Sequence, residues 1–457
     1  MKRAIILLLV LIAGFIFGDK IHAQDYVPDQ LVCQLNPGGN IYDIDSAYNT
    51  VTLYYLTSLD IYLLQTEPGA DVPTLAAQIA TDPDVFLCEP NYIFDTPEGV
   101  QSSQPFLDNV VSNDFQTQPA VASVQIPTAQ TIATGTGVKV AVVDVGINMS
   151  HPQLSTMVTS GFDFVSNDSI AADEPGGLAS GHGTFIAGVI SLVAPDAELV
   201  SYRVLDTTGR GNGFTVAEAV IQAVQHGCKV INLSMVMDNP HVALDAAIEY
   251  ARDNNVMVVA AAGNDSLETD KFPFRDSYTL GVAAVDSNNV LADFSNFGGK
   301  VDVCAPGTHI FGTFLDTTYA RWDGTSFATP FVAGQAALLY AKNPGADWSD
   351  IREAIMLSAV NIDAQNPGME GNLGAGLIDL AAALNLLSPY ICGDVNNDQL
   401  GPDIADIVFT VDYMFGGGPT PAVMNSIDVD ASGFIDVGDL VYFVEFSFHS
   451  GPNLNCP

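Results

Sequence analysis

Basic residues are scarce in this sequence, and they are unevenly distributed. Its 457 residues include 14 Lys or Arg against 53 Asp or Glu, a formal net charge of −39. No Lys or Arg lies between Lys20 and Lys139 or after Arg352. A chain of this charge has no general electrostatic attraction for nucleic acids or anionic lipids, which excludes partners held in that way. Saline surroundings or the binding of cations would each account for the composition.

Long apolar runs are lacking beyond the N-terminus. Lys2 and Arg3 precede an apolar run that reaches Phe17 and is too short to span a bilayer comfortably. Small residues close it, so the pattern predicts a secretory signal in residues 1–23, cleaved after Ala23. An N-terminal anchor helix is the alternative. We expect a secreted protein, extracellular or associated with the cell surface, and not an integral membrane protein.

Cysteine is also sparse. The six cysteines are Cys33, Cys88, Cys228, Cys304, Cys392 and Cys456. Export permits disulfides. Cys33 and Cys88 fall in the first and last predicted strands of one segment, and Cys392 and Cys456 bracket the last segment, so these two pairs are disulfide candidates. The other two lie beside apolar strands, where a free buried thiol is as good an interpretation as a bridge.

Composition and periodicity divide the rest of the chain into four segments, 24–100, 101–125, 126–388 and 389–457. The first shows the order strand, helix, strand, strand, helix, strand, which indicates a ferredoxin-like α+β unit whose first and last strands are neighbours. Residues 101–125 are polar and rich in Ser, Asn and Gln, which is typical of a linker.

Strands and helices alternate in residues 126–388. Strands are predicted over 138–143, 198–204, 230–234, 256–262 and 279–285, and helices over 183–193, 216–226 and 242–253. This alternation predicts an α/β fold with a mostly parallel sheet and helices on both faces. Reactive groups in such folds gather where strands end and helices begin.

Three short motifs lie at such junctions. Asp144 ends the apolar strand 140–143, His182 opens a predicted helix within Ser-Gly-His-Gly-Thr, and Ser326 follows Gly-Thr before an almost wholly apolar helix. Pro330 is expected in the first turn of that helix, where no N–H is needed. Each motif alone is explained by capping or by a turn. Together, an acid, an imidazole and a hydroxyl indicate nucleophilic catalysis.

These motifs, with Ala260–Asn264 and Asp302–Gly307, make residues 126–388 resemble the subtilisin-like serine proteases, the subtilases of peptidase family S8. The resemblance implies that Ser326 attacks a peptide carbonyl, that His182 carries its proton to the leaving amine, and that Asp144 orients the imidazole. It also implies an oxyanion hole formed by the Asn264 side chain and the Ser326 backbone N–H. No cofactor is required for this chemistry.

The resemblance extends to the residues that would bind substrate, and it shows departures. It assigns substrate binding to Ser234, Met235, Val236, Ala262 and Gly263. Val236 replaces a glycine that opens the main specificity pocket in many relatives, so we predict a preference for smaller side chains before the cut.

Three further departures lie beside the predicted catalytic residues. Val145 replaces a Ser or Thr able to support the catalytic acid. Phe185 and Phe327 replace a common His and Met, neither of which takes part in the chemistry.

Residues 24–100 resemble a subtilase propeptide, which packs on the enzyme and leaves its C-terminal end in the active site until it is cut. Cleavage is then expected between about residues 96 and 125. No basic residue lies there, which excludes a trypsin-like protease and favours cleavage by the enzyme itself. A retained accessory domain is the alternative.

The last segment, 389–457, contains two related acidic repeats. The second places oxygen ligands with the spacing of a calcium loop, and the first begins in the same way but has an extra residue before Asp406. The expected ligands are Asp394, Asn396, Asp398, Leu400, Asp403 and Asp406 in the first loop and Asp428, Asp430, Ser432, Phe434, Asp436 and Asp439 in the second.

The two loop-helix repeats resemble a dockerin module, a small EF-hand-like α domain, which implies Ca²⁺ binding and a cohesin-type partner. The helically spaced residues Val408, Val411, Phe415, Val441, Val444 and Phe448 predict a packed core between the repeats.

The sequence as a whole predicts a secreted serine endopeptidase that is made as a zymogen and that acts on protein or peptide substrates. The alternative is a catalytically silent binding protein of the same fold, displayed through its C-terminal module.

Overall fold

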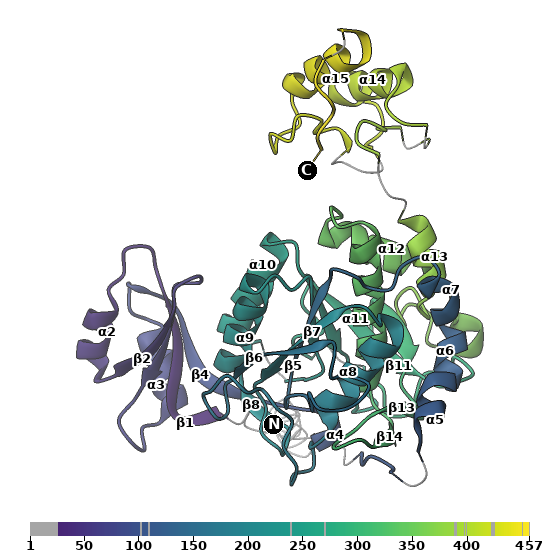
Figure 1. Cartoon of the computed structure of the whole chain (residues 1–457). Coiled ribbons are helices and arrows are strands. Elements are labelled where there is room, and N and C mark those ends of the chain that lie inside the picture. Colours follow the sequence, from purple (N-terminus) through teal and green to yellow (C-terminus); the bar gives the residue numbers. More distant parts are fainter. Residues whose placement is uncertain are drawn as a thin grey trace, which may run out of the picture.

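The computed structural model describes residues 26–100, 103–107, 110–237, 240–268, 271–387, 391–396, 398, 400–421, 426–449 and 451–456. The predicted signal, 1–23, and the predicted boundary at 388–389 lie outside the described residues. Three units follow one another along the chain (Figure 1). No helix among the described residues combines the length and the apolar character that a membrane crossing requires.

The first unit is a small sheet backed by two helices. Its elements are β1 (Tyr26–Leu35), α2 (Ile41–Tyr48), β2 (Val51–Leu56), β3 (Ile61–Gln65), α3 (Val72–Ile79) and β4 (Val85–Asp95). The strand order is β2-β3-β1-β4, and all neighbours are antiparallel. Cys33 lies directly opposite Cys88, and the two form a disulfide. This predicted pairing is confirmed.

The second unit is built on a seven-stranded parallel sheet in the order β12-β11-β10-β9-β5-β7-β6. The strands are β5 (Lys139–Asp144), β6 (Val158–Asp163), β7 (Glu198–Arg203), β9 (Val230–Leu233), β10 (Met257–Ala261), β11 (Thr279–Val285) and β12 (Val303–Pro306). Sequence periodicity did not predict β6 and β12. The prediction of a parallel sheet is confirmed.

Helices cover both faces of this sheet. The helices α8 (His182–Val193) and α11 (Thr325–Lys342) lie on one face, and α9 (Gly213–Gln225) and α10 (Val242–Asp253) lie on the other. Strand β5 is apolar from Val140 to Val143 because it serves both cores: Val140 and Val142 join the first, whereas Ala141 and Val143 join the second. The helices α12 (Trp348–Ser358) and α13 (Leu380–Leu386) extend the first core.

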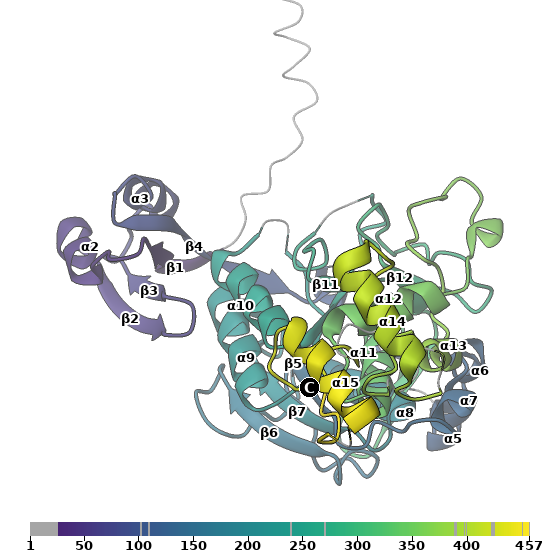
Figure 2. The same ribbon diagram turned by 90° about the horizontal axis from the view of Figure 1, so that it is seen from above.

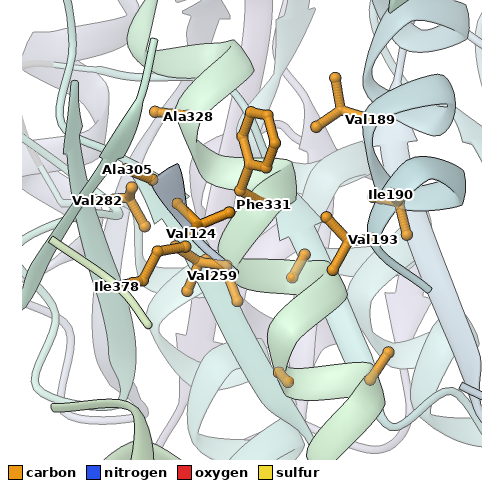
Figure 3. Packing of buried hydrophobic residues seen from close by; sticks show 14 of the residues in the cluster. Val124, Val189, Ile190, Val193, Val259, Val282, Ala305, Ala328, Phe331 and Ile378 are labelled. Carbon is orange, nitrogen blue, oxygen red and sulfur yellow. The ribbon is translucent and has the colours of Figure 1, made fainter. Parts of the chain in front are cut away.

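Helix α11 crosses the centre of the first core (Figure 3). Its side chains from Thr325 to Tyr340 are buried, which explains a sequence that is apolar on every face. It packs closely on α8, since a Cβ at Gly334 would lie 2.6 Å from the Cβ of Val193. Cys228 and Cys304 are free, and burial raises the pKa of both thiols to about 12, which suppresses the reactive thiolate.

The prediction that residues 101–125 form a linker is wrong. The segment contains α5 (Ser112–Thr117) and α6 (Pro119–Ser123), and α7 (Ile126–Gln130) follows directly. Phe115, Ala120 and Val124 are buried, the last two within the core that contains α11. A proline stands at the start of two of these helices, where its fixed φ favours helix initiation. The polar composition of the segment gave no sign of these helices. Before Ser112, Phe106 is paired with Arg321 through two backbone hydrogen bonds.

The first unit packs against α9 and α10 of the second (Figure 2). Tyr54 donates a hydrogen bond of 2.7 Å to Glu218 of α9, and the carboxylate of Glu89 accepts one of 2.7 Å from the N–H of Val242 at the start of α10. Burial raises the pKa of Glu89 to about 7. The interface therefore combines helix-terminus contacts with apolar packing.

The third unit contains α14 (Ile404–Val411), a short π-helix (Asp412–Gly416) and α15 (Val437–His449). Cys392 and Cys456 form the second predicted disulfide, which is confirmed. The core predicted for this unit is wrong in most positions: Val408 is 62 % exposed, Phe415 63 % and Phe448 57 %. The actual core is formed by Val395, Ile407, Ile427, Val429 and Phe443. Three of these residues lie in the loops, and Ile407 and Phe443 lie at helix positions other than the predicted ones.

Candidate active site

Asp144 and His182 come together at the carboxyl edge of the sheet. Asp144 is the last residue of β5, and His182 is the first residue of α8. The Nδ1 of His182 lies 2.9 Å and 3.0 Å from the two carboxylate oxygens of Asp144, and both side chains are buried. The N–H of Val145 donates a 2.8 Å hydrogen bond to Asp144 Oδ1, so the backbone supports the acid at the position where the side-chain hydroxyl is missing.

A second buried acid, Asp173, holds the loop that presents His182. It accepts hydrogen bonds from the N–H of Gly181 at 3.0 Å and from the hydroxyl of Thr184 at 2.6 Å. Burial raises the pKa of Asp173 to about 7. The sequence analysis did not single out this residue, because it stands nine positions before His182 in an irregular segment.

Ser326 lies in the first turn of α11, with Gly324 at the N-cap. The prediction that Pro330 lies in the first turn is wrong. The helix begins at Thr325, so the proline lies beyond the first turn. Its missing N–H leaves the carbonyl of Ser326 without an intrahelical donor. The hydroxyl of Ser234 donates to that carbonyl instead, at 3.0 Å. The helix thus connects the predicted nucleophile to the predicted substrate strand.

The side chain of Asn264 is oriented by its neighbour Thr325. Its Oδ1 accepts hydrogen bonds from the backbone N–H of Thr325 at 3.0 Å and from the hydroxyl at 2.9 Å. The amide N–H₂ group therefore points the other way, toward the carboxylate of Glu98. Gly263 just before it has a φ of +100°, and a Cβ there would lie 2.5 Å from the side chain of Asn296. Only glycine suits this position.

Three groups converge on a single carboxylate, that of Glu98 in the short helix α4 (Pro97–Val100). Ser326 Oγ donates to Glu98 Oε2 at 2.7 Å, and His182 Nε2 lies 3.1 Å from the same oxygen. Asn264 Nδ2 donates to Glu98 Oε1 at 2.9 Å. Glu98 is buried. No local pattern around Glu98 marks it as functional, and only the expectation that the end of segment 24–100 lies in the site pointed toward it.

This arrangement determines the protonation of His182. Burial alone would lower its pKa, but the carboxylates of Asp144 and Glu98 outweigh burial and raise the pKa above the usual value of 6.5. The imidazolium form then donates one N–H to each carboxylate.

The chain on either side of α4 is paired with the second unit through its backbone. Asp95 pairs with Val236 through two backbone hydrogen bonds of 3.4 Å and 3.1 Å, and β4 pairs on its other side with β8 (Arg210–Asn212). Beyond Glu98, Phe106 pairs with Arg321 in β14 (Tyr319–Trp322), which forms a hairpin with β13 (Ile310–Thr313). The described residues before and after α4 are therefore both paired with the second unit, and Glu98 between them reaches Ser326.

The predicted substrate-binding residues divide into two groups. Ser234, Met235 and Val236 form a stretch that pairs with Asp95 through Val236, and the Met235 side chain is buried in the core. The other two have structural partners among the described residues: the carbonyl of Ala262 accepts from the Asn296 side chain, and the N–H of Gly263 donates to Thr325 Oγ1. These two residues set the position of Asn264.

A comparison with protein families identifies the middle of the chain. The model of the subtilase family matches residues 135–376. The chain belongs to the subtilase family. Like its named relatives, it is a subtilisin-like serine protease.

Individual relatives agree with this assignment. The subtilase is 40 % identical to thermitase of Thermoactinomyces vulgaris over 249 residues, which cover 52 % of this chain and 87 % of thermitase. It is 37 % identical to subtilisin BL of Lederbergia lenta over 273 residues, 58 % of this chain and 97 % of that protein.

Solved structures extend the likeness in fold. Fervidolysin of Fervidobacterium pennivorans, a keratinolytic enzyme related to subtilisin, matches 80 % of this subtilase and 62 % of its own chain with a TM-score of 0.67 at 23 % identity. A protease of Pseudoalteromonas arctica matches 63 % of this chain and all of its own, with a TM-score of 0.55 at 28 % identity.

The described residues of the two acidic loops share a pattern of hydrogen bonds from backbone N–H groups to side chains, despite the extra residue in the first loop. Asp406 accepts from the N–H of Asp403 at 2.9 Å, and Asp439 accepts from the N–H of Asp436 at 2.9 Å. Further equivalent bonds join Asp394, Asn396, Asp398 and Leu400 in one loop and Asp428, Asp430, Ser432 and Phe434 in the other.

The second loop fits a divalent cation. Carboxylate oxygens of Asp428, Asp430 and Asp439 lie within 4.8 Å of one another, and Asp439 Oδ1 is buried without a hydrogen-bond donor. The side chain of Asp436 instead accepts from the N–H of Gly438 at 2.6 Å. In the first loop Asp403 caps α14, which gives it a structural partner of its own.

Proposed function

We propose that this subtilase hydrolyses internal peptide bonds of proteins through Ser326, His182 and Asp144. The observation that carries the proposal is the convergence of Ser326 Oγ, His182 Nε2 and Asn264 Nδ2 on one carboxylate. A carboxylate is planar, but it carries the same negative charge as the tetrahedral oxyanion. A peptide carbonyl in its place would meet a nucleophile, a proton carrier and an oxyanion donor together.

The reaction follows from this geometry. Ser326 Oγ attacks the carbonyl carbon while its proton passes to His182 Nε2, and Asp144 stabilises the imidazolium through Nδ1. Asn264 donates to the negative oxygen; in subtilisin itself, loss of the corresponding donor lowers kcat by about 10²–10³. The imidazolium then gives its proton to the leaving amine, which leaves an acyl-enzyme. Water hydrolyses the ester by the same steps in reverse, with His182 as the base.

We propose further that the enzyme is secreted as a zymogen and that residues 24–100 are its propeptide. Two observations support this: the first unit packs on α9 and α10, and its last strand is followed by α4, which brings Glu98 to Ser326. The side-chain carboxylate stands where the carbonyl to be cut must go, so the intact chain is held in a non-productive arrangement. Self-cleavage in the stretch between Thr96 and Ser112 would release it.

A labelling experiment tests the protease proposal. After processing of the full-length chain, a fluorophosphonate probe should label Ser326, and casein should be degraded. A processed chain in which Ser326 stays unlabelled would exclude the proposal and leave a silent binding protein.

Val236 supports a prediction about the residue before the cut. Its side chain is buried, and its backbone pairs with Asp95 at the end of β4. We expect peptides with small side chains before the cut to be cleaved faster than peptides with large aromatic ones. Hydrolysis rates for a series from Ala to Phe at that position measure the effect, and the opposite order would contradict it.

We propose that the C-terminal unit is a dockerin-like module that binds Ca²⁺ and docks onto a cohesin-type domain. The carboxylates of the second loop and the orphan oxygen of Asp439 support the ion site. Hard oxygen ligands of this kind suit Ca²⁺, and the first loop, with its equivalent backbone bonds, is proposed as a second site. The exposed apolar residues Val408, Val411 and Phe415 on α14 and the adjoining π-helix offer a surface for a partner.

Removal of Ca²⁺ should unfold the C-terminal unit selectively. With free Ca²⁺ at about 100 times Kd, the ion contributes about 2.7 kcal/mol to its stability, and chelation removes this. Hydrogen exchange on the full chain should then speed up in residues 391–456 but not in residues 135–376. Asp439→Asn should reproduce the effect in the presence of Ca²⁺, whereas the exposed Asp412→Asn should not. Equal exchange with and without chelator would contradict the proposal.

A further inference from the structure

Asp95 at the end of β4 and Arg210 on β8 form a charge pair that has no part in the proposed reaction. Strand β4 ends between β8 on one side and Val236 on the other, and Asp95 is paired with both. Its Oδ1 lies 3.1 Å from Nε of Arg210 on β8. The side chains are 37 % and 43 % exposed, so the pair lies at the protein surface.

The neighbours of Asp95 point the other way. Phe94 and Thr96 are buried, as alternation along a strand requires when the residue between them faces solvent. Asp95 and Arg210 are cross-strand partners in register, which places both side chains on one face. A substrate that replaces this strand would therefore present the side chain at the position of Asp95 to Arg210.

The register relates this position to the bond that is cut. Asp95 lies opposite Val236, and the chain leaves the strand before Pro97, where α4 begins. A substrate that stays extended in the same antiparallel register would place the residue two positions later opposite Ser234. The carbonyl of Ser234 lies 3.4 Å from Ser326 Oγ. The residue opposite Ser234 is thus the one whose carbonyl meets the nucleophile, and the position of Asp95 is the third residue before the cut.

The charge of Arg210 is unusual for this molecule. The chain has only 14 basic residues against 53 acidic ones, so its overall field repels an acidic substrate. The nearby carboxylate of Asp206 accepts hydrogen bonds from the backbone N–H of Arg210 and from Thr208. These bonds hold the loop between the three residues. The guanidinium remains directed at the end of β4.

We propose that Arg210 is a specificity-determining residue that selects an acidic side chain at the third position before the cut. The inference rests on the proposed protease function and adds to it a class of substrate. The pair is partly exposed, so the expected effect is modest: a ratio of kcat/KM for Asp over Asn of about 2 to 5. Lysine at that position should be disfavoured.

Three peptides that differ only by Asp, Asn or Lys at this position test the proposal. The full-length chain is allowed to process itself, and labelled Ser326 gives the concentration of active sites. Arg210→Gln should bring the Asp to Asn ratio close to one, and Arg210→Glu should reverse the order of Asp and Lys. Lys139→Gln is the control. It removes a basic side chain of similar exposure, 40 %, at the end of β5 opposite to Asp144, and the variant should keep the wild-type order of cleavage rates for the three peptides. About 1 M salt should reduce the wild-type ratio, since it screens an exposed pair.

The outcomes separate the two proposals. Labelling and cleavage with the same Asp to Asn ratio in the wild type and in Arg210→Gln would overturn the selection by Arg210 and leave the protease intact. A preference for Asp that survives both Arg210 variants would also overturn it. If no peptide is cut and Ser326 is not labelled, the protease function itself fails, and the inference fails with it.

Discussion

Replacing Ser326 by alanine should abolish proteolysis, with a fall in kcat of about 10⁶. In subtilisin itself, loss of the nucleophile or of its histidine lowers kcat by about 2 × 10⁶, and the remaining rate comes from the oxyanion hole and from binding. Here the hydroxyl is the only group of Ser326 that alanine removes, and the helix around it is tightly packed. Hydrolysis of casein by the full-length chain after incubation is the measurement.

The same variant tests whether the enzyme processes itself. Ser326→Ala should remain a single chain, whereas the wild type should lose its first unit by a cut between Thr96 and Ser112, as mass spectrometry would reveal. Ser150→Ala, which changes an exposed loop serine bonded to Asn148, should process normally. Processing of a pure Ser326→Ala chain at the wild-type rate would contradict self-cleavage.

Replacing Glu98 by alanine should speed self-processing by about 100-fold. The carboxylate accepts hydrogen bonds from Ser326, His182 and Asn264, and charge-assisted bonds of this kind each stabilise by about 1.5–3 kcal/mol, although bonds to one group do not add fully. Alanine would vacate the position needed by a peptide carbonyl. The rate of appearance of labelled Ser326 measures the effect.

The pH dependence of self-processing tests whether the pairing of His182 with Glu98 causes the block. Because the folded-state pKa of His182 is raised, the imidazolium–carboxylate pairing stabilises the blocked state fully below the usual pKa of 6.5 and is lost as pH rises through the raised value. Self-processing of the wild type should therefore accelerate into the alkaline range. In Glu98→Ala the same rise should begin at lower pH, because Asp144 alone remains to hold the proton.

A control separates this effect from a general loss of stability. Glu67→Ala removes an exposed carboxylate of the first unit that is bonded to Asn49, and it should process like the wild type. If Glu98→Ala also processes like the wild type, with an unshifted pH profile, the carboxylate does not block the site.

Much of the fold was predictable because its signals are local. The strands around residues 140 and 258 are apolar on both faces, and the helices between them end at recognisable turns, so alternation alone indicated a parallel sheet. The carboxyl ends of parallel strands share one edge, and this brought Asp144 and Asn264 to the same side as the starts of α8 and α11. The disulfide Cys33–Cys88 followed from the expected neighbouring strands, and Cys392–Cys456 followed from the position of both cysteines at the ends of one segment.

The predictions that were wrong concern segments whose structure depends on contacts with residues far away in the chain. The supposed linker contains helices because Ala120 and Val124 find the core beneath α11. The apolar repeat at Val408 and Phe415 was assigned to a core, but such a repeat in sequence does not reveal whether a core or a partner will cover it. Pro330 was placed one turn too early, and its effect depends on Ser234, a residue far away in the chain.

The sequence by itself determined the family, the parallel sheet and the three residues that we propose for catalysis, because each is encoded in a short motif with its own backbone requirement. Only the tertiary structure revealed that Glu98 lies among Ser326, His182 and Asn264 and that Asp95 faces Arg210. The reason is physical: these contacts join residues 84 to 228 positions apart in the chain, and a carboxylate carries no local mark of the group it will meet.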